Sequence, residues 1–497
     1  MADTQSIPAL RIRICNRAPV NPKGDFVLYW MIASRRVNWN YALERAVEWA
    51  EKLAKPLVIL EALRCDYPWA NERLHQFVME GMADNAALCK KAGVLYYPYV
   101  EPAPGRGKGL LAALAARACR VVTDEFPCFF LPRMVAAASR LLPVQLEAVD
   151  SNGLLPLGAG DHIFTTARSF RRFYQLKILD HLSSFPRRDP LTRLRPSHAY
   201  KLPDTIAQRW PAALPSWLGE NSEALARLPI DHSLKPVLTK GGSKAAVAAL
   251  NRFLLRNLKR YAEPRREPTE DTTSGLSPYL HFGHISVHQV FTKLMRKEGW
   301  TIENISPRAH GQRNGWWGIS APAEAFLDQL LTWRELGFNM CWLNKDYNRY
   351  RSLPEWAQET LEAHARDLRT HLYTQEDFQQ ARTHDELWNA AQRQLLREGK
   401  IHNYLRMLWG KKILEWSPTP QHALEIMIHL NDRYAIDGRD PNSYSGIFWC
   451  LGRYDHPWWP DRPVFGTVRY MSSQNTARKM KVHGYLRKYA PASDPKV

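Results

Sequence analysis

The stretch spanning residues 383–450 constrains the fold most, because its helix start and stop signals predict helices in close succession. Thr383 and Glu386 have the spacing of a capping box, and Gly399 is a typical helix stop. A second stop, Ser417-Pro418, is followed directly by a Thr-Pro pair, which is typical of an N-cap and a first helical residue. We therefore expect three helices, over 385–398, 401–417 and 420–431.

The middle helix of the three carries polar groups on one stripe. Asn403, Arg406 and Met407 have the spacing i, i+3 and i+4, so they share a face. Trp409 and Trp416 are seven residues apart, which corresponds to about 10 Å along a helix axis. A tryptophan-rich core explains each indole alone, but an apolar core gains nothing from burying an arginine that binds nothing. The pattern therefore indicates a binding site within a helical core.

Length, cysteine usage and charge exclude several classes of protein. A chain of 497 residues is long enough for two to four domains. The seven cysteines are scattered and form no CxxC pair, which argues for a reducing compartment and against a disulfide framework or a metal site. There is no signal-type apolar segment and no apolar run of about 18 residues, so we expect a cytoplasmic protein that does not span a membrane. The net charge of +19 favours nucleic acid as a partner, the alternative being a basic surface that only maintains solubility.

Residues 1–150 alternate between strand-length apolar runs and helical patterns. Such alternation predicts a parallel sheet with helices on both faces. The first run is followed by ASRRVNWN instead of a glycine fingerprint, so the domain is expected to be Rossmann-like without the signal for a dinucleotide. We expect strands over 26–33, 57–62, 94–100, 120–124 and 144–149, and helices over 37–53, 71–91 and 109–118 and from 131 onward.

The composition changes twice after residue 150. Prolines interrupt residues 151–236, as expected of a connector between domains. Within this connector, TTARSFRRFYQLK indicates a basic amphipathic surface helix. From residue 237 onward the patterns are helical, as in KAAVAALNRFLLRNLKRYAE, and no convincing strand follows. The fold expected is an α/β domain over 1–150, a connector over 151–236 and an all-α domain over 237–497.

Four segments of the second half carry a resemblance to a known family. HDELWNAAQ, GKIHNYLRM, KKILEW and LNDRYAIDGRDPN resemble the class II branch of the photolyase/cryptochrome flavoproteins, in the part that wraps FAD. The resemblance is dense over 260–470 and looser before 240. In the first domain YWMIASRRVNWNYAL is similar to the antenna domain of that family, whose second chromophore is a deazaflavin or a folate. Neither chromophore is favoured by these residues.

The resemblance implies where FAD binds. Family members hold its phosphates at a Thr-Ser-x-Leu-Ser segment before a helix, whose backbone N–H groups suit a pyrophosphate. Asn431 corresponds to the residue facing the flavin N5, where an amide can donate or accept, although a plain helix-end cap is the alternative. Arg406 and Asp437 are expected to pair beside the ring. The implied FAD-binding residues are Tyr261, Thr273, Ser274, Gly275, Leu276, Ser277, Asn403, Arg406, Asn431, Asp437 and Asp440.

The resemblance also implies an electron-transfer chain, running in the order Trp409, Trp388, Trp416. Further tryptophans such as Trp356 are assigned to packing. A flipped pyrimidine dimer needs apolar walls, which Met407, Trp333 and Trp449 match, while the basic segment 469–489 is a candidate for phosphate contacts.

Gln329 departs from the class II pattern, which normally has a glutamate four residues before this tryptophan. Glutamine retains the reach and a donor but loses the negative charge. Photolyases for the (6-4) lesion carry glutamine at a comparable place, together with a histidine pair. Here Asn403 and Met407 occupy the corresponding positions, which follows the cyclobutane-dimer pattern.

The resulting hypothesis is light-driven repair of cyclobutane pyrimidine dimers in DNA by electron transfer from excited reduced FAD. Damaged DNA is the expected partner, no membrane is involved, and the protein is expected to be a monomer. The alternatives are a cryptochrome-like blue-light receptor, or a photolyase with altered lesion preference because of Gln329. A basic helical nucleic-acid binder without flavin is disfavoured because it leaves Arg406, Asp437 and Asn431 without a purpose.

Overall fold

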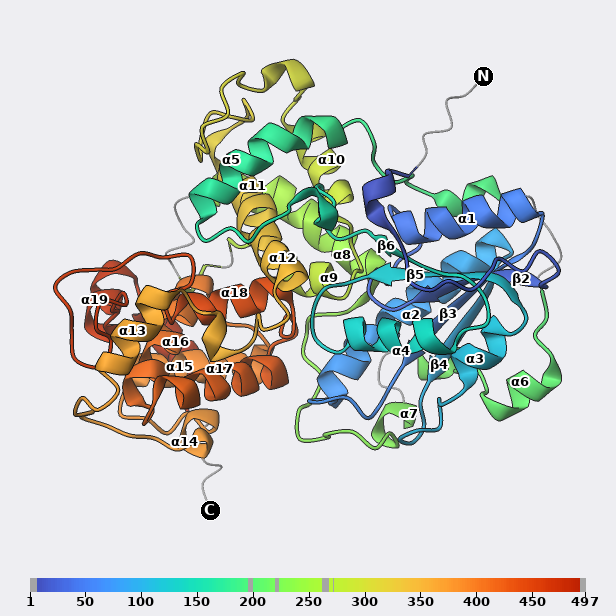
Figure 1. Cartoon of the computed structure of the whole chain (residues 1–497). Coiled ribbons are helices and arrows are strands. Elements are labelled where there is room, and N and C mark those ends of the chain that lie inside the picture. Colours follow the sequence, from blue (N-terminus) through green and yellow to red (C-terminus); the bar gives the residue numbers. More distant parts are fainter. Residues whose placement is uncertain (1–6, 195–199, 220–222, 262–267, 271, 492–497) are drawn as a thin grey trace. The chain divides into compact units, whose positions relative to one another are not determined.

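The computed structural model describes residues 7–194, 200–219, 223–261, 268–270 and 272–491 (Figure 1). The chain forms two compact units, each of which is discontinuous in sequence. The first contains Met1–Asp161, Leu176–Arg252 and Gly275–Thr301, and the second contains His162–Gln175, Phe253–Ser274 and Ile302–Val497. The functional division at residues 150 and 236 assumed continuous segments, and it stays a prediction.

A six-stranded sheet forms the centre of the first unit (Figure 1). Its order is β1-β6-β5-β2-β3-β4, and every pairing is parallel except that of β1 with β6. The expected Rossmann-like parallel sheet is confirmed. The edge strand β1 was not expected, because its three residues are largely solvent-facing and carry no apolar run. The strands are β1 (Ile12–Ile14), β2 (Phe26–Met31), β3 (Leu57–Leu63), β4 (Leu95–Val100), β5 (Ala118–Glu125) and β6 (Leu146–Asp150).

Helices connect the strands and bury the sheet. β2, β5 and β6 are buried along their whole length, as expected for parallel strands with both faces covered. The first helix begins at Tyr41 and not at Val37, because the Asn40 side chain caps it by accepting from the Leu43 N–H at 3.1 Å. These connecting helices are α1 (Tyr41–Leu53), α2 (Glu72–Ala92), α3 (Leu110–Ala115) and α4 (Leu131–Leu141).

The point where the strand order reverses, between β2 and β5, is where doubly wound sheets usually bind a ligand. Here Asp124 fills the ring of backbone amides that follows β2. Its Oδ2 accepts hydrogen bonds from the N–H groups of Ile32, Ala33 and Ser34 at 2.8, 2.8 and 3.0 Å. Its Oδ1 accepts from the Tyr29 hydroxyl at 2.7 Å. A side-chain carboxylate thus sits where a nucleotide fold places a phosphate, consistent with the missing glycine fingerprint.

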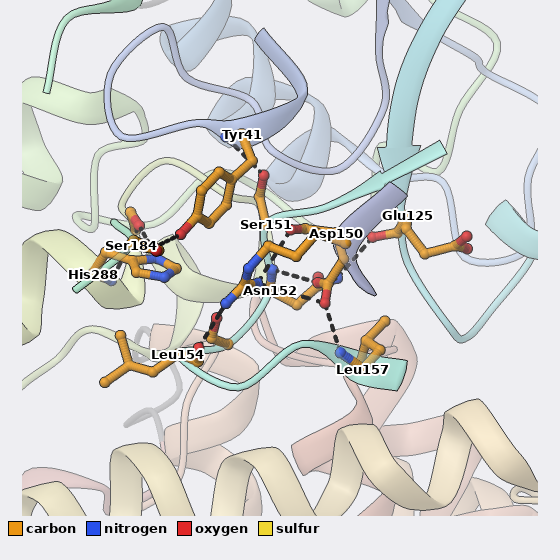
Figure 2. A network of polar contacts seen from close by, with 12 residues as sticks. Tyr41, Glu125, Asp150, Ser151, Asn152, Leu154, Leu157, Ser184 and His288 are labelled. Carbon is orange, nitrogen blue, oxygen red and sulfur yellow. Dashed lines mark hydrogen bonds and ion pairs between the residues drawn. The ribbon is translucent and has the colours of Figure 1, made fainter. Parts of the chain in front are cut away.

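The chain that leaves β6 is anchored within the first unit, as Figure 2 shows. Asp150 Oδ2 accepts from the Leu157 N–H at 2.7 Å, and Asn152 Nδ2 donates to the Glu125 carbonyl at 2.7 Å. Ser151 Oγ accepts from the Tyr41 N–H at 3.1 Å. The start of the proline-rich segment is therefore fixed by hydrogen bonds to the carboxyl ends of β5 and β6 and to the start of α1.

The second unit is helical, and every strand in the described part of the chain precedes Ser151. The expected class, an α/β part plus an all-α part, is confirmed. No helix within the described ranges is both long and apolar enough to cross a membrane. The helices used below are α5 (Ala167–Lys177), α12 (Arg334–Leu343), α15 (Glu386–Glu398), α16 (Asn403–Trp416), α17 (Pro420–Tyr434), α18 (Pro441–Trp449), α19 (Ser473–Lys479) and α20 (His483–Lys488), together with a π-helical turn over Asp328–Trp333.

Candidate functional site

The three expected helices around residue 400 form, with one correction at the start of α15. The N-cap is Asp385, whose Oδ1 accepts from the Trp388 N–H at 3.0 Å. The capping box between Thr383 and Glu386 was wrong, because the Thr383 hydroxyl instead donates to Asn389 Oδ1 at 2.8 Å. Gly399 ends α15 at a φ of +67°, as expected.

Gly410 allows α16 and α18 to approach each other closely. A Cβ at this position would lie 2.5 Å from Cys450 Sγ and 3.1 Å from Met427 Sδ. α17 begins as expected, with Thr419 accepting from the His422 N–H at 3.1 Å. The sequence signals for stops and caps therefore located these helices, and the glycine sets their spacing.

A row of three indoles runs through this helical core. The rings of Trp409 and Trp388 are nearly parallel, with an interplanar angle of 4° and centroids 6.5 Å apart. Trp388 and Trp416 lie 6.1 Å apart at 67°. All three are at most 2% exposed. The order in space is the order expected for the electron-transfer chain, whose role stays a prediction.

Hydrogen bonds orient the indoles. Trp388 Nε1 donates to the Trp409 carbonyl at 3.0 Å, and Trp409 Nε1 donates to Gln392 Oε1 at 2.9 Å. At the Trp416 end, the Tyr373 ring lies 5.7 Å away, and its hydroxyl is 2.7 Å from His384 Nδ1. Gln392 was missed from the sequence, although its position four residues after Trp388 on one helix was a usable signal.

Arg406 and Asp437 pair, with 3.1 Å between Nη2 and Oδ1. The turn after α17 positions Asp437, because buried Arg439 adopts a φ of +64° and donates its N–H to Asp432 Oδ1 at 2.8 Å. Burial raises the pKa of Asp432, whose other oxygen accepts from the Tyr444 hydroxyl at 2.9 Å. No sequence signal pointed to Asp432 or Arg439.

Asn431 is buried at the end of α17, and its amide is held in place. Its Nδ2 donates to Asp432 Oδ1 at 3.0 Å and to Ser443 Oγ at 2.6 Å. These donors fix the orientation of the amide. Asp440 is buried as well and caps α18 by accepting from the Asn442 N–H at 2.9 Å, whereas Asn403 is exposed at the first position of α16.

The expected phosphate-binding segment lies at the division between the units. Thr273 and Ser274 belong to the second unit, whereas Gly275, Leu276 and Ser277 belong to the first. The helix Ser277–His281 begins without a side-chain cap, with Leu276 at the N-cap position. Tyr261 is buried in the second unit, where its ring packs edge-on against Phe253 at 5.5 Å.

The four expected lesion contacts are all half-buried. Gln329 and Trp333 lie four residues apart on the π-helical turn, a distortion that often marks functional sites. Met407 lies on α16 and Trp449 at the end of α18, and these helices are in contact where Cys450 Sγ lies 3.9 Å from the Met407 carbonyl oxygen. The π-helical turn was not expected from the sequence.

Lys411, which the sequence did not single out, lies fully buried behind Trp449. Its Nζ donates to the Cys450 carbonyl at 2.8 Å and lies 5.2 Å from the Trp449 ring centroid. Burial lowers the pKa of Lys411 from 10.5 to about 8. The folded protein therefore holds fewer protons than the unfolded chain between these two pH values.

Replacing this lysine by methionine, Lys411→Met, should raise the free energy of unfolding at pH 7 by about 1–2 kcal/mol. Each unit of pKa shift corresponds to about 1.4 kcal/mol, and losing the hydrogen bond offsets part of the gain. Wild-type stability should also rise as the pH goes from 8 toward 10, because the unfolded chain binds more protons there. Urea unfolding of wild type and variant at pH 7, 8 and 10 checks both expectations. If the gap between variant and wild type stays constant across this window, the lysine does not titrate as described.

The sequence and the fold were compared with those of known proteins. No family model matches the chain. Its fold is similar to that of a bacterial class III photolyase from Agrobacterium tumefaciens, whose crystal structure matches with a TM-score of 0.65 over 98% of this chain and 88% of the other, at 17% identity. The deoxyribodipyrimidine photo-lyase of Methanothermobacter thermautotrophicus is 34% identical over 97% of this chain and 98% of the relative, and that of Potorous tridactylus is 32% identical over 97% and 85%. The chain therefore belongs to the photolyase/cryptochrome family.

Proposed function

We propose that this protein repairs cyclobutane pyrimidine dimers in DNA with light, as a class II-like deoxyribodipyrimidine photo-lyase that holds FAD in its helical unit. The observation that carries the proposal is the buried row of Trp409, Trp388 and Trp416. It runs from the middle of α16 through Trp388 on α15 to the last residue of α16. Aromatic pairs stabilise any core, but a continuous row of indoles at centroid distances of 6.5 and 6.1 Å also provides short steps for an electron.

The helical unit fits FAD. Arg406 and Asp437 form a partly exposed ion pair that can stand beside a ring system, with side chains 21% and 13% exposed. Asn431 presents an orientated amide, and Tyr261, Thr273 and Ser274 supply hydroxyls for phosphates. Bound FAD would supply the light-driven electron. Protein residues would bind and position it, and the set that the resemblance implies also includes Gly275, Leu276, Ser277, Asn403 and Asp440. A deazaflavin or a folate is the proposed class of second chromophore.

A flipped dimer would meet half-buried walls. Met407, Trp333 and Trp449 offer a sulfur and two indoles to stack on the bases, and Gln329 offers both a donor and an acceptor to a base edge. Lys411 lies behind Trp449, and Arg469 lies 5.7 Å from the same ring, so cations fix this wall. Phosphates outside the pocket would be held by the basic segment 469–489, whose α20 is anchored to α15 by Tyr485, with 2.7 Å from its hydroxyl to Gln394 Oε1.

Direct repair tests the proposal. FAD-loaded, reduced protein is irradiated with blue light together with an oligonucleotide that contains one cyclobutane thymine dimer, and the undamaged strand is measured by chromatography. We expect recovery in light and none in the dark. If the protein photoreduces normally but recovers no undamaged strand, the repair proposal fails and a blue-light receptor becomes the better function.

Gln329 favours one second candidate, a photolyase with altered lesion preference. The same assay with a strand that contains a (6-4) photoproduct distinguishes the two candidates. If this strand is repaired and the dimer strand is not, the (6-4) photoproduct is the substrate. The glutamine at the base edge is therefore the residue on which this choice depends.

Restoring the acid, Gln329→Glu, should leave dimer repair unchanged or raise it by up to about tenfold, the equivalent of about 1.4 kcal/mol. The side chain keeps its reach, and a carboxyl group can form a stronger hydrogen bond to a base edge that gains charge. Single-turnover repair by pre-reduced protein is the measurement. A complete loss of dimer repair, with FAD still bound, would contradict a class II type of pocket.

A further inference from the structure

A notch with a volume of about 460 Å³ lies on the second unit, between the beginning of α5 and the loop at residues 308–313. It is polar and open to solvent, and its chemistry is basic. Neither the indole row nor the proposed lesion contacts include any residue of it. The notch is lined by Thr166, Arg168, Ser169, Arg172 and His310.

The basic side chains of the notch are exposed. Arg168 and Arg172 are four residues apart on one face of α5, and His310 joins them from the loop. None of the three makes an ion pair with an acidic side chain in the ranges that the structure describes. By contrast, neighbouring Arg171 is buried and pairs with Asp328 at 2.7 Å.

Buried polar groups fix the loop to the helix. The Arg171 Nη1 donates to the Gly311 carbonyl at 3.2 Å, and the Gly311 N–H donates to Gln175 Oε1 at 2.8 Å. Gly311 has a φ of +76°, and a Cβ there would lie 2.7 Å from the Arg168 carbonyl oxygen. The position of His310 beside the two arginines is therefore set by the fold.

We propose that this notch binds backbone phosphates of nucleic acid. Two guanidinium groups match phosphate oxygens in geometry and charge, and the hydroxyls of Thr166 and Ser169 add neutral contacts. The inference rests on the proposed function in taking DNA as the polyanion. Arg171 joins α5 to Asp328, the residue before Gln329, so a phosphate held here adjoins the helix that carries a proposed lesion contact.

The test is the salt dependence of binding to undamaged duplex DNA, measured by fluorescence anisotropy of a labelled duplex. Each phosphate contact contributes about 0.9 to the slope of log K against log salt concentration. The double variant Arg168→Ala/Arg172→Ala should therefore reduce the magnitude of this negative slope by about 2. Its far-ultraviolet circular dichroism should match wild type, because both side chains are exposed. An unchanged slope and affinity overturn the proposal.

A matched control removes two exposed cations elsewhere. Lys177 lies at the far end of α5, and Arg366 lies outside the notch; neither makes an ion pair within the described ranges. Lys177→Ala/Arg366→Ala has the same net charge as the test variant and should keep a slope close to wild type. An equal loss in both variants would mean that only overall charge acts, and the proposal would fall.

Gly311→Ala removes no charge but forces the loop away from α5, and it should reduce the magnitude of the slope by a fraction of the double-variant effect.

Inorganic phosphate, compared with chloride at equal ionic strength, shows whether the notch binds free phosphate or the phosphates of the duplex. Competition with the duplex in wild type, lost in the double variant, supports the proposal; phosphate binding without any effect on the duplex overturns it. Repair of dimer-containing DNA by wild-type protein is measured in parallel. If wild-type protein repairs no dimer but the double variant still shows a weaker salt dependence, the proposed function fails while the phosphate site stands.

Discussion

In the variant Trp409→Phe, light-driven reduction of the FAD-loaded protein should fall by more than an order of magnitude, whereas repair by chemically reduced protein should stay close to wild type. Trp409 is the first member of the buried row, and its ring stacks on Trp388 at 6.5 Å. Phenylalanine keeps an aromatic ring in the core but is much harder to oxidise than indole. Absorption spectra recorded during illumination, set against single-turnover repair, give the two rates.

The control for this experiment is Trp356→Phe. Trp356 is a half-buried indole that packs against Gly452 and belongs to no aromatic row. Its replacement should leave both rates unchanged. An equal loss of photoreduction and repair in Trp409→Phe would contradict the assigned role, because it would indicate damage to the FAD site. Loss of the hydrogen bond to Gln392 accounts for a modest decrease in stability only, of about 1–3 kcal/mol.

Local signals in the sequence predicted most of the elements. Short segments rich in apolar residues located five of the six strands, because parallel strands covered on both faces consist mainly of such residues. Gly399 and Thr419 located helix ends, because their roles depend only on neighbouring backbone groups. β1 escaped because its pairing with β6 is formed across the whole domain and leaves no local trace. The capping box failed for a local reason, since Asp385 caps the helix instead and accepts from the Trp388 N–H.

The site depended more on long-range packing than on spacing. Helical periodicity related Trp409 to Trp416 along α16, but nothing local placed Trp388 between them; that came from the family resemblance. Gln392 was within reach of a helix-face argument. The turn built on Asp432 and Arg439 was not, because it requires a positive φ at an arginine, which sequence patterns disfavour.

The amide ring after β2 leads to the second large effect, the loss of stability in Asp124→Ala. Three buried backbone N–H groups and the Tyr29 hydroxyl would lose their acceptor. Each unsatisfied buried group costs about 1–3 kcal/mol, so the free energy of unfolding should fall by about 4 kcal/mol or more. That is a large part of the stability of a typical domain. Urea unfolding, followed by circular dichroism, measures the loss.

Two comparisons show whether the loss arises from the amide ring itself. Asp204→Ala removes an exposed aspartate that pairs with Lys201 at 3.5 Å, and should cost less than about 1 kcal/mol. Formate supplies a carboxylate of the right charge, so it should restore part of the stability of Asp124→Ala, while chloride at equal concentration should not. Rescue is expected because the amides that hold Asp124 are the kind of anion cradle that other doubly wound sheets leave open for a phosphate. If formate restores nothing, the aspartate acts through packing alone, and the ring of N–H groups has no affinity for anions.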